Sequence, residues 1–245
     1  MRRRNSTGTG GPVVPAAMPR DVEAVEAVID VLDRGVTGEA AAHAAITSTL
    51  VTELGLDYGA VWLPGPDGAF RLFAEEGPLV AALRPTAAAR VETIVPTDGY
   101  GGEALRSKRA VLVDGDCEPR DCARWAGACV AGATTGCFLP MIEDGRVTAL
   151  YEYYNDGEMP FFGQRQGKWD SLGRLLSHAR RAALARAALQ ETLDDRAAVT
   201  TVVTEIGAAA SQEQALRVAL DTVRTAFGWA SVSYTHLTLP TNREV

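Results

Sequence analysis

The sequence predicts an α+β fold in which an antiparallel sheet is flanked by helices. Three observations support this prediction: helical patterns precede and follow the strands, neighbouring strands are joined by turn sequences, and the regular strand–helix–strand alternation of a parallel sheet does not occur. The chain has 245 residues, of which 47% are hydrophobic and 22% charged. This is the composition of a folded globular protein with room for one large domain or two small ones.

Two amphipathic helices and a hairpin come first. Apolar residues recur at three- and four-residue steps from Asp21 to Leu32, and a second helical segment ends at Gly55. The runs 58–63 and 69–76 then predict two strands, because both are rich in β-branched and aromatic residues and the turn sequence PGPDG lies between them.

The middle of the chain predicts four more strands and two short helices. We expect a strand at 90–96, a helix at 102–109, a strand at 110–114 and a helix at about 121–131. The run from Gly136 to Tyr154 predicts two strands joined by Glu143-Asp144-Gly145, which is a strong hairpin signal. The runs 58–63 and 147–154 are apolar enough to be covered on both faces, so we expect them to be the central strands.

A long helix is predicted from Gly163 towards Leu193, with an apolar stripe that includes Trp169 and Leu176. After it, the order of helix, small-residue break, helix and aromatic strand repeats the beginning of the chain, with 171 positions between Tyr58 and Trp229. A repeat on this scale predicts that a second copy of the domain starts near Arg196.

Three segments carry a resemblance to a known family. GAVWLPGPDGAFRLF, GEALRSKRAVLVDGD and GCFLPMIEDGRVTALYEYY resemble GAF domains, although Ala149 stands where the family usually has glycine. CARWAGACVAGATTGCFLP and ALDTVRTAFGWA resemble, more narrowly, the GAF regions of bacterial methyl-accepting chemotaxis-like transducers. The resemblance implies a tandem GAF sensory protein with a PAS-like antiparallel sheet, a long connecting helix and an incomplete second GAF domain.

The domain boundaries follow from these patterns. We expect a disordered leader at 1–20, the first GAF domain at 21–162, a connecting signalling helix at 163–195, the truncated start of a second GAF domain at 196–231, and a tail at 232–245. VSYTHLTLPT, from Val232 to Thr241, resembles a translated sequencing adapter. We therefore expect the tail to be non-native and to form no part of a packed domain.

The four cysteines lie in one short stretch with the spacing C-x4-C-x6-C-x7-C. Metal sites favour C-x2-C pairs, and no such pair exists here, so we expect no metal site. We also expect no disulfide, because no secretory signal is evident and the cytosol is reducing. Cys122 and Cys137 are open to two interpretations: a thiol-lined site, or small buried apolar residues.

The site that the resemblance implies is a cavity between the sheet and the segment 117–136, on the face opposite the terminal helices. We expect five residues to border it as ligand-binding residues: Trp62, Cys122, Trp125, Cys137 and Tyr151. Aromatic walls would supply contact area and thiols soft polar points. The alternative is that Trp125 fills the space and leaves no room for a ligand.

We therefore expect a cytoplasmic sensor that binds a small ligand or a partner. The connecting helix would form a homodimer and relay the signal to an output module absent from this chain. The alternatives are a ligand-free dimerisation scaffold and an enzyme such as a free-methionine sulfoxide reductase. We expect no enzyme, because no nucleophile–base pair stands out and the tandem copy argues against it, and the cofactor remains open. The net charge of −7 argues against nucleic acid, and no stretch is long and apolar enough to span a membrane.

Overall fold

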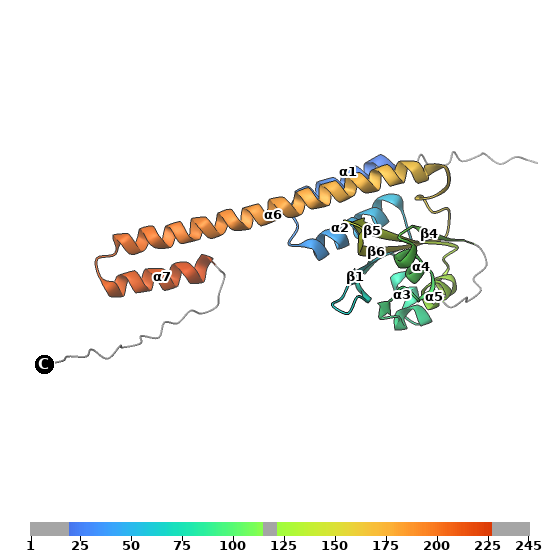
Figure 1. Ribbon diagram of the computed structural model, residues 1–245, viewed down its shortest axis with the longest axis horizontal. Helices are drawn as coiled ribbons and strands as arrows, with labels where there is room; N and C mark the ends of the chain where they lie inside the picture. The colour runs from blue at the N-terminus through green and yellow to red at the C-terminus, as the bar shows by residue number, and fades with distance from the viewer. Residues whose placement is uncertain (1–19, 115–121, 227–245) are drawn as a thin grey trace, which may run out of the picture. The chain divides into compact units, whose positions relative to one another are not determined.

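A computed structural model describes residues 20–114 and 122–226. These residues form two units, which divide between Arg181 and Ala182. The first unit has a six-stranded antiparallel sheet with helices on both faces, so the predicted α+β class is confirmed. Figure 1 shows α1, α2 and the beginning of α6 on one side of the sheet and α3, α4 and α5 on the other. We call the first side the helix side and the second the crossover side.

The sheet has the strand order β3-β2-β1-β6-β5-β4. Its strands are β1 (Tyr58–Pro64), β2 (Phe70–Glu76), β3 (Thr93–Ile94), β4 (Val111–Asp114), β5 (Thr135–Glu143) and β6 (Arg146–Asn155). The two central strands, β1 and β6, are the ones predicted to be central. The turn between β5 and β6 has Asp144 and Gly145 at positive φ of 48° and 74°, as a hairpin with this twist requires.

The expected strand at 90–96 is much shorter than predicted. Ala87–Arg90 form a 3-10 helix, η1, and only Thr93 and Ile94 pair with β2. The segment lies at the sheet edge against the start of β2, and Pro96 has no N–H to continue the ladder. The prediction of a seven-residue strand was therefore wrong.

On the helix side, α1 (Asp21–Asp33) and α2 (Glu39–Leu54) pack beside the start of α6 (Gln166–Ala208). Gly59 of β1 lets α2 lie close to the sheet, since a Cβ at this position would be 2.4 Å from Val51 Cγ2. Asp21 is buried and pairs with Arg165, in the 3-10 turn η2 (Gly163–Arg165), and with Lys168 Nζ at 3.0 Å. This ion cluster ties the beginning of α6 to the beginning of α1.

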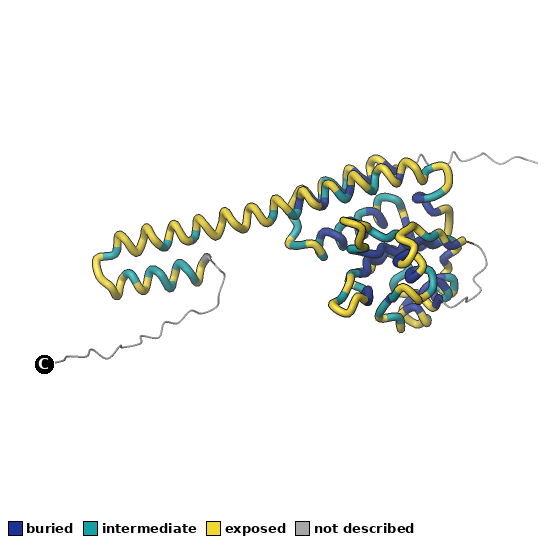
Figure 2. The backbone as a smooth tube through the Cα atoms, viewed as in Figure 1, coloured by how far each residue is buried: buried dark blue, intermediate teal, exposed yellow. Residues whose placement is uncertain are grey.

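The crossover side is covered by α3 (Val80–Leu83), α4 (Gly99–Ser107) and α5 (Ala123–Ala131). The main hydrophobic core lies here, and the dark blue trace in Figure 2 marks its buried strands. The largest side chains of this core include Tyr58, Trp62, Trp125, Phe138 and Tyr154. All five expose 1% or less of their surface, so this core is densely filled.

In the second unit, the rest of α6 is followed by α7 (Gln212–Ala226), and Thr222 Oγ1 donates a hydrogen bond to Glu205 at 2.9 Å. The helix α6 begins three residues after the predicted start and continues past 195 to Ala208. Helix, short break and helix is the order expected at the start of a second copy. The strand expected after it, and the tail at 232–245, lie outside the described residues.

Candidate functional site

Among the residues that the structure describes, a cavity lies on each face of the sheet of the first unit. The larger, of about 430 Å³, lies on the helix side between the sheet, α2 and α6, and we call it the helix-side pocket. It is lined by residues of α2, the segment between α4 and β4, β5, β6, the loop before α6 and α6 itself: Ile46, Leu50, Lys108, Ala110, Leu139, Pro140, Met141, Ile142, Tyr151, Tyr153, Phe161, Phe162, Gln166, Trp169, Asp170, Gly173, Arg174, Leu176 and Ser177.

Aromatic rings form the floor and one end of the helix-side pocket. The rings of Tyr151 and Tyr153, two residues apart on β6, stack at 6.2 Å with an interplanar angle of 11°. Phe161 continues this row at 5.2 Å from Tyr153, and its edge meets Trp169 of α6 at 4.7 Å. The pocket therefore offers a flat apolar surface of the kind that small-molecule sites use.

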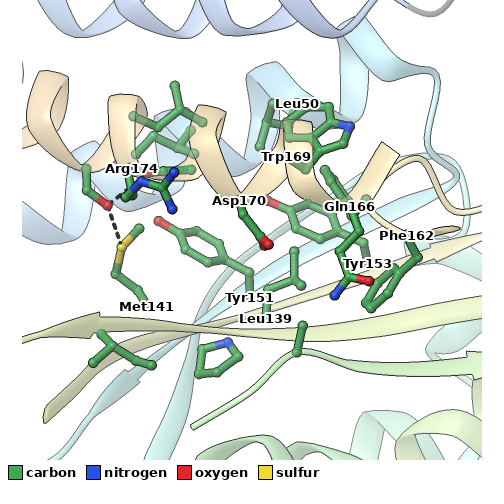
Figure 3. Close-up of a pocket in the computed structure, with 18 of the residues that line it drawn as sticks. Leu50, Leu139, Met141, Tyr151, Tyr153, Phe162, Gln166, Trp169, Asp170 and Arg174 are labelled. Atoms are coloured by element: carbon green, nitrogen blue, oxygen red, sulfur yellow. Dashed lines mark hydrogen bonds between the residues drawn. The ribbon is translucent and has the colours of Figure 1, made fainter. Parts of the chain in front are cut away.

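Polar groups of the helix-side pocket come from α6. Gln166, Asp170 and Arg174 lie one turn apart along the helix, and Figure 3 shows them pointing towards the sheet. Gly173 lies between them, and a Cβ added there would meet no atom within 4 Å. The cavity is therefore open above Gly173, in the interior of a helix where alanine would be about 1 kcal/mol more favourable.

A buried polar cluster adjoins the helix-side pocket at the hydroxyl group of Tyr151. Tyr151 Oη is 2.6 Å from His43 Nδ1, and His43 is fully buried. Burial, with the nearby Arg180 guanidinium, lowers the pKa of His43 to about 4, so the imidazole is neutral at neutral pH. Arg180 of α6 is also buried, and it pairs with Glu143 and, at 3.0 Å, with Glu39.

The second cavity, of about 270 Å³, lies on the crossover side, and we call it the crossover-side pocket. It is lined by residues around α4, by the start of α5 and by β5: Val91, Ile94, Thr97, Asp98, Gly99, Gly101, Cys122, Ala123, Arg124 and Phe138. Cys122 occupies the N-cap position of α5 without a side-chain capping hydrogen bond, and its thiol is free. Burial raises the pKa of this thiol, which disfavours the thiolate.

A hydrogen-bonded network fills the space beside the crossover-side pocket. Glu152 of β6 is fully buried and pairs with Arg124 through Nε and Nη2, each at 3.0 Å. It also accepts hydrogen bonds from Trp62 Nε1, at 2.8 Å, and from Tyr154 Oη. Arg124 in turn donates to Tyr58 Oη at 2.6 Å and lies 5.1 Å from the ring centre of Trp62. Every oxygen of the carboxylate is thus satisfied within the domain.

The structure does not bring the five predicted site residues together. Trp62, Cys122 and Trp125 lie on the crossover side, and of these only Cys122 lines a cavity. Tyr151 lines the helix-side pocket on the other face. Cys137 is fully buried and pairs across the strands with Tyr153. The expectation of one cavity bordered by Cys122, Trp125, Cys137 and Tyr151 was wrong, because these residues lie on two opposite faces of the sheet.

The cysteines and possible metal ligands can be placed in the same way. Cys122 and Cys137 are free, whereas Cys129 of α5 forms a disulfide, contrary to the expectation of none. Cys117 lies outside the described residues. Within the ranges 20–114 and 122–226, no group of three His, Cys, Asp or Glu residues is arranged to hold a metal ion. Over the same ranges, no helix combines the length and hydropathy needed to cross a bilayer.

The contribution of α6 to a pocket was not predicted from the sequence. The signal was present: Gln166, Asp170 and Arg174 recur at four-residue steps on the side of the helix that also carries Gly173. A glycine inside a strongly helical pattern is a cue for close packing or for open space. From the sequence, only dimerisation and relay of the signal were assigned to this helix.

Comparison with known proteins agrees with this architecture. The family model described as GAF domain matches residues 41–171. A search of curated proteins finds no match. Among solved structures, free methionine-R-sulfoxide reductase from Neisseria meningitidis, in complex with its substrate, is 19% identical at a TM-score of 0.51, over 68% of this chain and 91% of that one.

Two further solved structures are similar in fold. The reduced form of fRMsr of Staphylococcus aureus is 12% identical at a TM-score of 0.52, over 69% of this chain and 99% of that one. A putative GAF sensor protein from Burkholderia vietnamiensis is 12% identical at a TM-score of 0.51, over 67% of this chain and 96% of that one. At these identities the likeness concerns the fold alone.

The comparisons correct one expectation and establish the family. The expectation that the chain is not an enzyme is overturned, because methionine-R-sulfoxide reductases are among the structures that share its fold. GAF domains are commonly sensory domains, and a GAF sensor is among the similar structures as well. With the family model matching more than half of its length and the sheet topology in agreement, the chain belongs to the GAF domain family.

Proposed function

We propose that the first GAF domain, residues 21–162, is a sensor that binds a small molecule in the helix-side pocket and passes the signal to α6. One observation carries this proposal: α6 is itself a wall of the pocket, through Gln166, Trp169, Asp170 and Gly173. A ligand in this place would touch the helix that leaves the domain. No intermediate element is needed between binding and a change in the helix.

The thermodynamics of such a sensor are simple. A ligand shifts a helix between two positions only by the difference in its affinity for them. Because the helix-side pocket is bounded by α6 on one side and by β5 and β6 on the other, any movement of the helix changes its shape. The ligand therefore favours the helix position that fits it best, and a separate output module reads that position.

We further propose that α6 pairs with the same helix of a second copy. Large apolar residues of α6 remain exposed at heptad spacing: Leu189 and Val203 are fourteen residues apart and expose 61% and 65%, and Val199 and Ile206 are seven apart and expose 57% and 39%. The yellow trace in Figure 2 shows how exposed this part of α6 is. Apolar residues that repeat every seven positions are typical of coiled coils.

The test is to fill the pocket from α6. In Gly173→Leu the added Cβ meets no atom within 4 Å, so we expect the fold to be kept, the side chain to extend into the cavity and the helix to gain up to about 1 kcal/mol. A metabolite that stabilises the wild-type chain should lose its effect on this variant. At one hundred times its Kd such a ligand adds about 2.7 kcal/mol to the free energy of unfolding, which thermal denaturation detects readily.

The matched control is Gly167→Leu, because Gly167 also lies in α6 with no atom within 4 Å of an added Cβ but does not line the pocket. Ligand stabilisation should survive in this control. Sedimentation equilibrium of the same proteins, with and without Val203→Lys, measures the homodimer. If no metabolite stabilises the wild-type chain and the dimer persists, the ligand-free scaffold is the correct function.

A second candidate function is thiol chemistry in the crossover-side pocket, favoured by the free thiol of Cys122 in that cavity. Two of the similar structures described above are reductases, and the Neisseria meningitidis enzyme is named for free methionine-R-sulfoxide as its substrate. In such a reaction two thiols lose their hydrogens and form one disulfide, and the sulfoxide oxygen leaves as water to give the thioether. The raised pKa of Cys122 opposes this function, because the thiolate is the nucleophile.

The assay for this candidate follows consumption of free methionine-R-sulfoxide with dithiothreitol as the electron donor. Turnover should be lost in Cys122→Ser and kept in Cys137→Ala, whose thiol is buried away from the cavity. Absence of turnover in the wild-type chain would exclude the reductase and leave the sensor.

A further inference from the structure

Within the sensor function proposed above, on which this inference rests, we propose that the helix-side pocket takes a free aromatic α-amino acid in its zwitterionic form. The pocket combines three features that this ligand class requires together. It has a negative group, a positive group close to it, and a flat apolar slot beneath both.

The charges come from one face of α6. Asp170 and Arg174 are one helical turn apart, which places their Cβ atoms about 5–6 Å from each other. Figure 3 shows both side chains directed from the helix towards the sheet. An acid and a base at this spacing usually pair with each other. Here, within the part of the chain that the structure describes, Asp170 forms no ion pair or hydrogen bond, and Arg174 donates only to Ser171 Oγ at 3.0 Å.

This arrangement fits a ligand that carries opposite charges on adjacent atoms. Asp170 can accept hydrogen bonds from an α-ammonium group, and Arg174 retains donors that match a carboxylate. Lys108 also lines the pocket, but its Nζ is held by the carbonyl oxygen of Gly145 at 2.6 Å. The unpaired charges that face the cavity are therefore one of each sign.

The apolar slot lies below these charges. The stacked rings of Tyr151 and Tyr153 form its floor, and Leu139 stands beside them (Figure 3). Burial raises the pKa of both tyrosines, so the floor carries no charge. Arg180, six residues after Arg174 on α6, is neutralised by Glu39 and Glu143. The slot thus favours an uncharged aromatic side chain, which gains contact area on the tyrosine faces.

The size of the cavity agrees with this class of ligand. At about 430 Å³ it is near the lower end of the volumes that small-molecule pockets have, about 300–1,000 Å³. A single aromatic amino acid fits within it, whereas a dinucleotide or a macrocyclic cofactor does not.

The experiment measures binding of L-phenylalanine and L-tryptophan to the full chain by calorimetric titration. Two analogues separate the charges: 2-phenylethylamine lacks the carboxylate, and 3-phenylpropionate lacks the ammonium group. Asp170→Asn should weaken phenylalanine binding about tenfold and leave the affinity for 3-phenylpropionate unchanged. Arg174→Gln should weaken phenylalanine binding about tenfold and leave the affinity for 2-phenylethylamine unchanged. Each loss is that expected for one charge-assisted hydrogen bond.

Matched controls are Asp195→Asn and Arg196→Gln, which change the same charges on exposed positions of α6 outside the pocket and should leave binding unchanged. Equal affinity for phenylalanine and for either analogue would overturn the zwitterion. The amino-acid proposal is also overturned if neither amino acid binds while another metabolite stabilises the wild-type chain but not Gly173→Leu. In that case the sensor function stands. If Gly173→Leu abolishes no stabilisation by any metabolite, the sensor function itself fails.

Discussion

Replacement of Arg124 with methionine is expected to lower the free energy of unfolding of the GAF domain by about 3–5 kcal/mol. The reason is that Arg124 is the cation facing Glu152, and both side chains are buried. Without the guanidinium, the carboxylate keeps hydrogen bonds from Trp62 and Tyr154 but has no compensating charge. Urea denaturation at neutral pH, followed by tryptophan fluorescence, measures the change.

The control is the double variant Arg124→Met/Glu152→Leu. Removing both charges replaces a buried ion pair with apolar groups, which is often neutral or stabilising, so the double variant should be more stable than Arg124→Met alone. A double variant that is less stable than either single variant would contradict this account. It would mean that the network supports the fold mainly through its hydrogen bonds rather than through charge compensation.

Replacement of Trp125 with alanine is expected to cost about 3–5 kcal/mol in stability, as large-to-small changes of buried aromatic residues do. Trp125 exposes 1% of its surface, packs against Tyr154 with ring centres 5.8 Å apart, and lines neither described pocket. A Cβ on Gly136 would lie 2.8 Å from its ring, which shows how tightly the site is filled. The Trp125 side chain therefore fills space in the hydrophobic core and does not border a ligand cavity.

Val130→Ala is the matched control, because Val130 belongs to the same helix α5 and is 80% exposed. Its stability should change by no more than about 0.5 kcal/mol. If Trp125→Ala unfolds at the same urea concentration as the wild-type chain, packing of the Trp125 side chain does not stabilise the core, and this account of Trp125 is wrong.

Much of the fold could be predicted from local chemistry. The central position of β1 and β6 followed from their apolar runs, and the β5–β6 hairpin followed from Asp144-Gly145. Both signals are local: one depends on burial of a short segment, and the other on the few residues that accept positive φ. The strand expected at 90–96 was predicted too long, because the length of a strand at a sheet edge depends on its partner strand, and only Thr93 and Ile94 pair with β2.

The site could be predicted only in part, because periodicity gives relative and not absolute orientation. Alternation placed Cys137 on the same face as Leu139, and Tyr151 on the same face as Tyr153, and the structure agrees. Nothing in the sequence says which of the two faces meets α6. Cys137 and Tyr151 were therefore assigned to the crossover side, but both lie on the helix side of the sheet. Phe138, the neighbour of Cys137, faces the crossover side and lines its pocket.

The ion pairs at the two ends of the pocket-lining part of α6 restrict how this helix can respond. Asp21 holds Arg165 and Lys168 before the pocket, and Glu39 and Glu143 hold Arg180 after it. Because this part of α6 is anchored near both of its ends, it cannot tilt away from the sheet without breaking one of these sets of ion pairs. The long side chains of Lys168 and Arg180 allow a small rotation about the helix axis, and such a rotation changes the direction in which residues of the following turns point. For the sensor proposed above, we therefore expect the signal to be a rotation of α6 rather than a displacement.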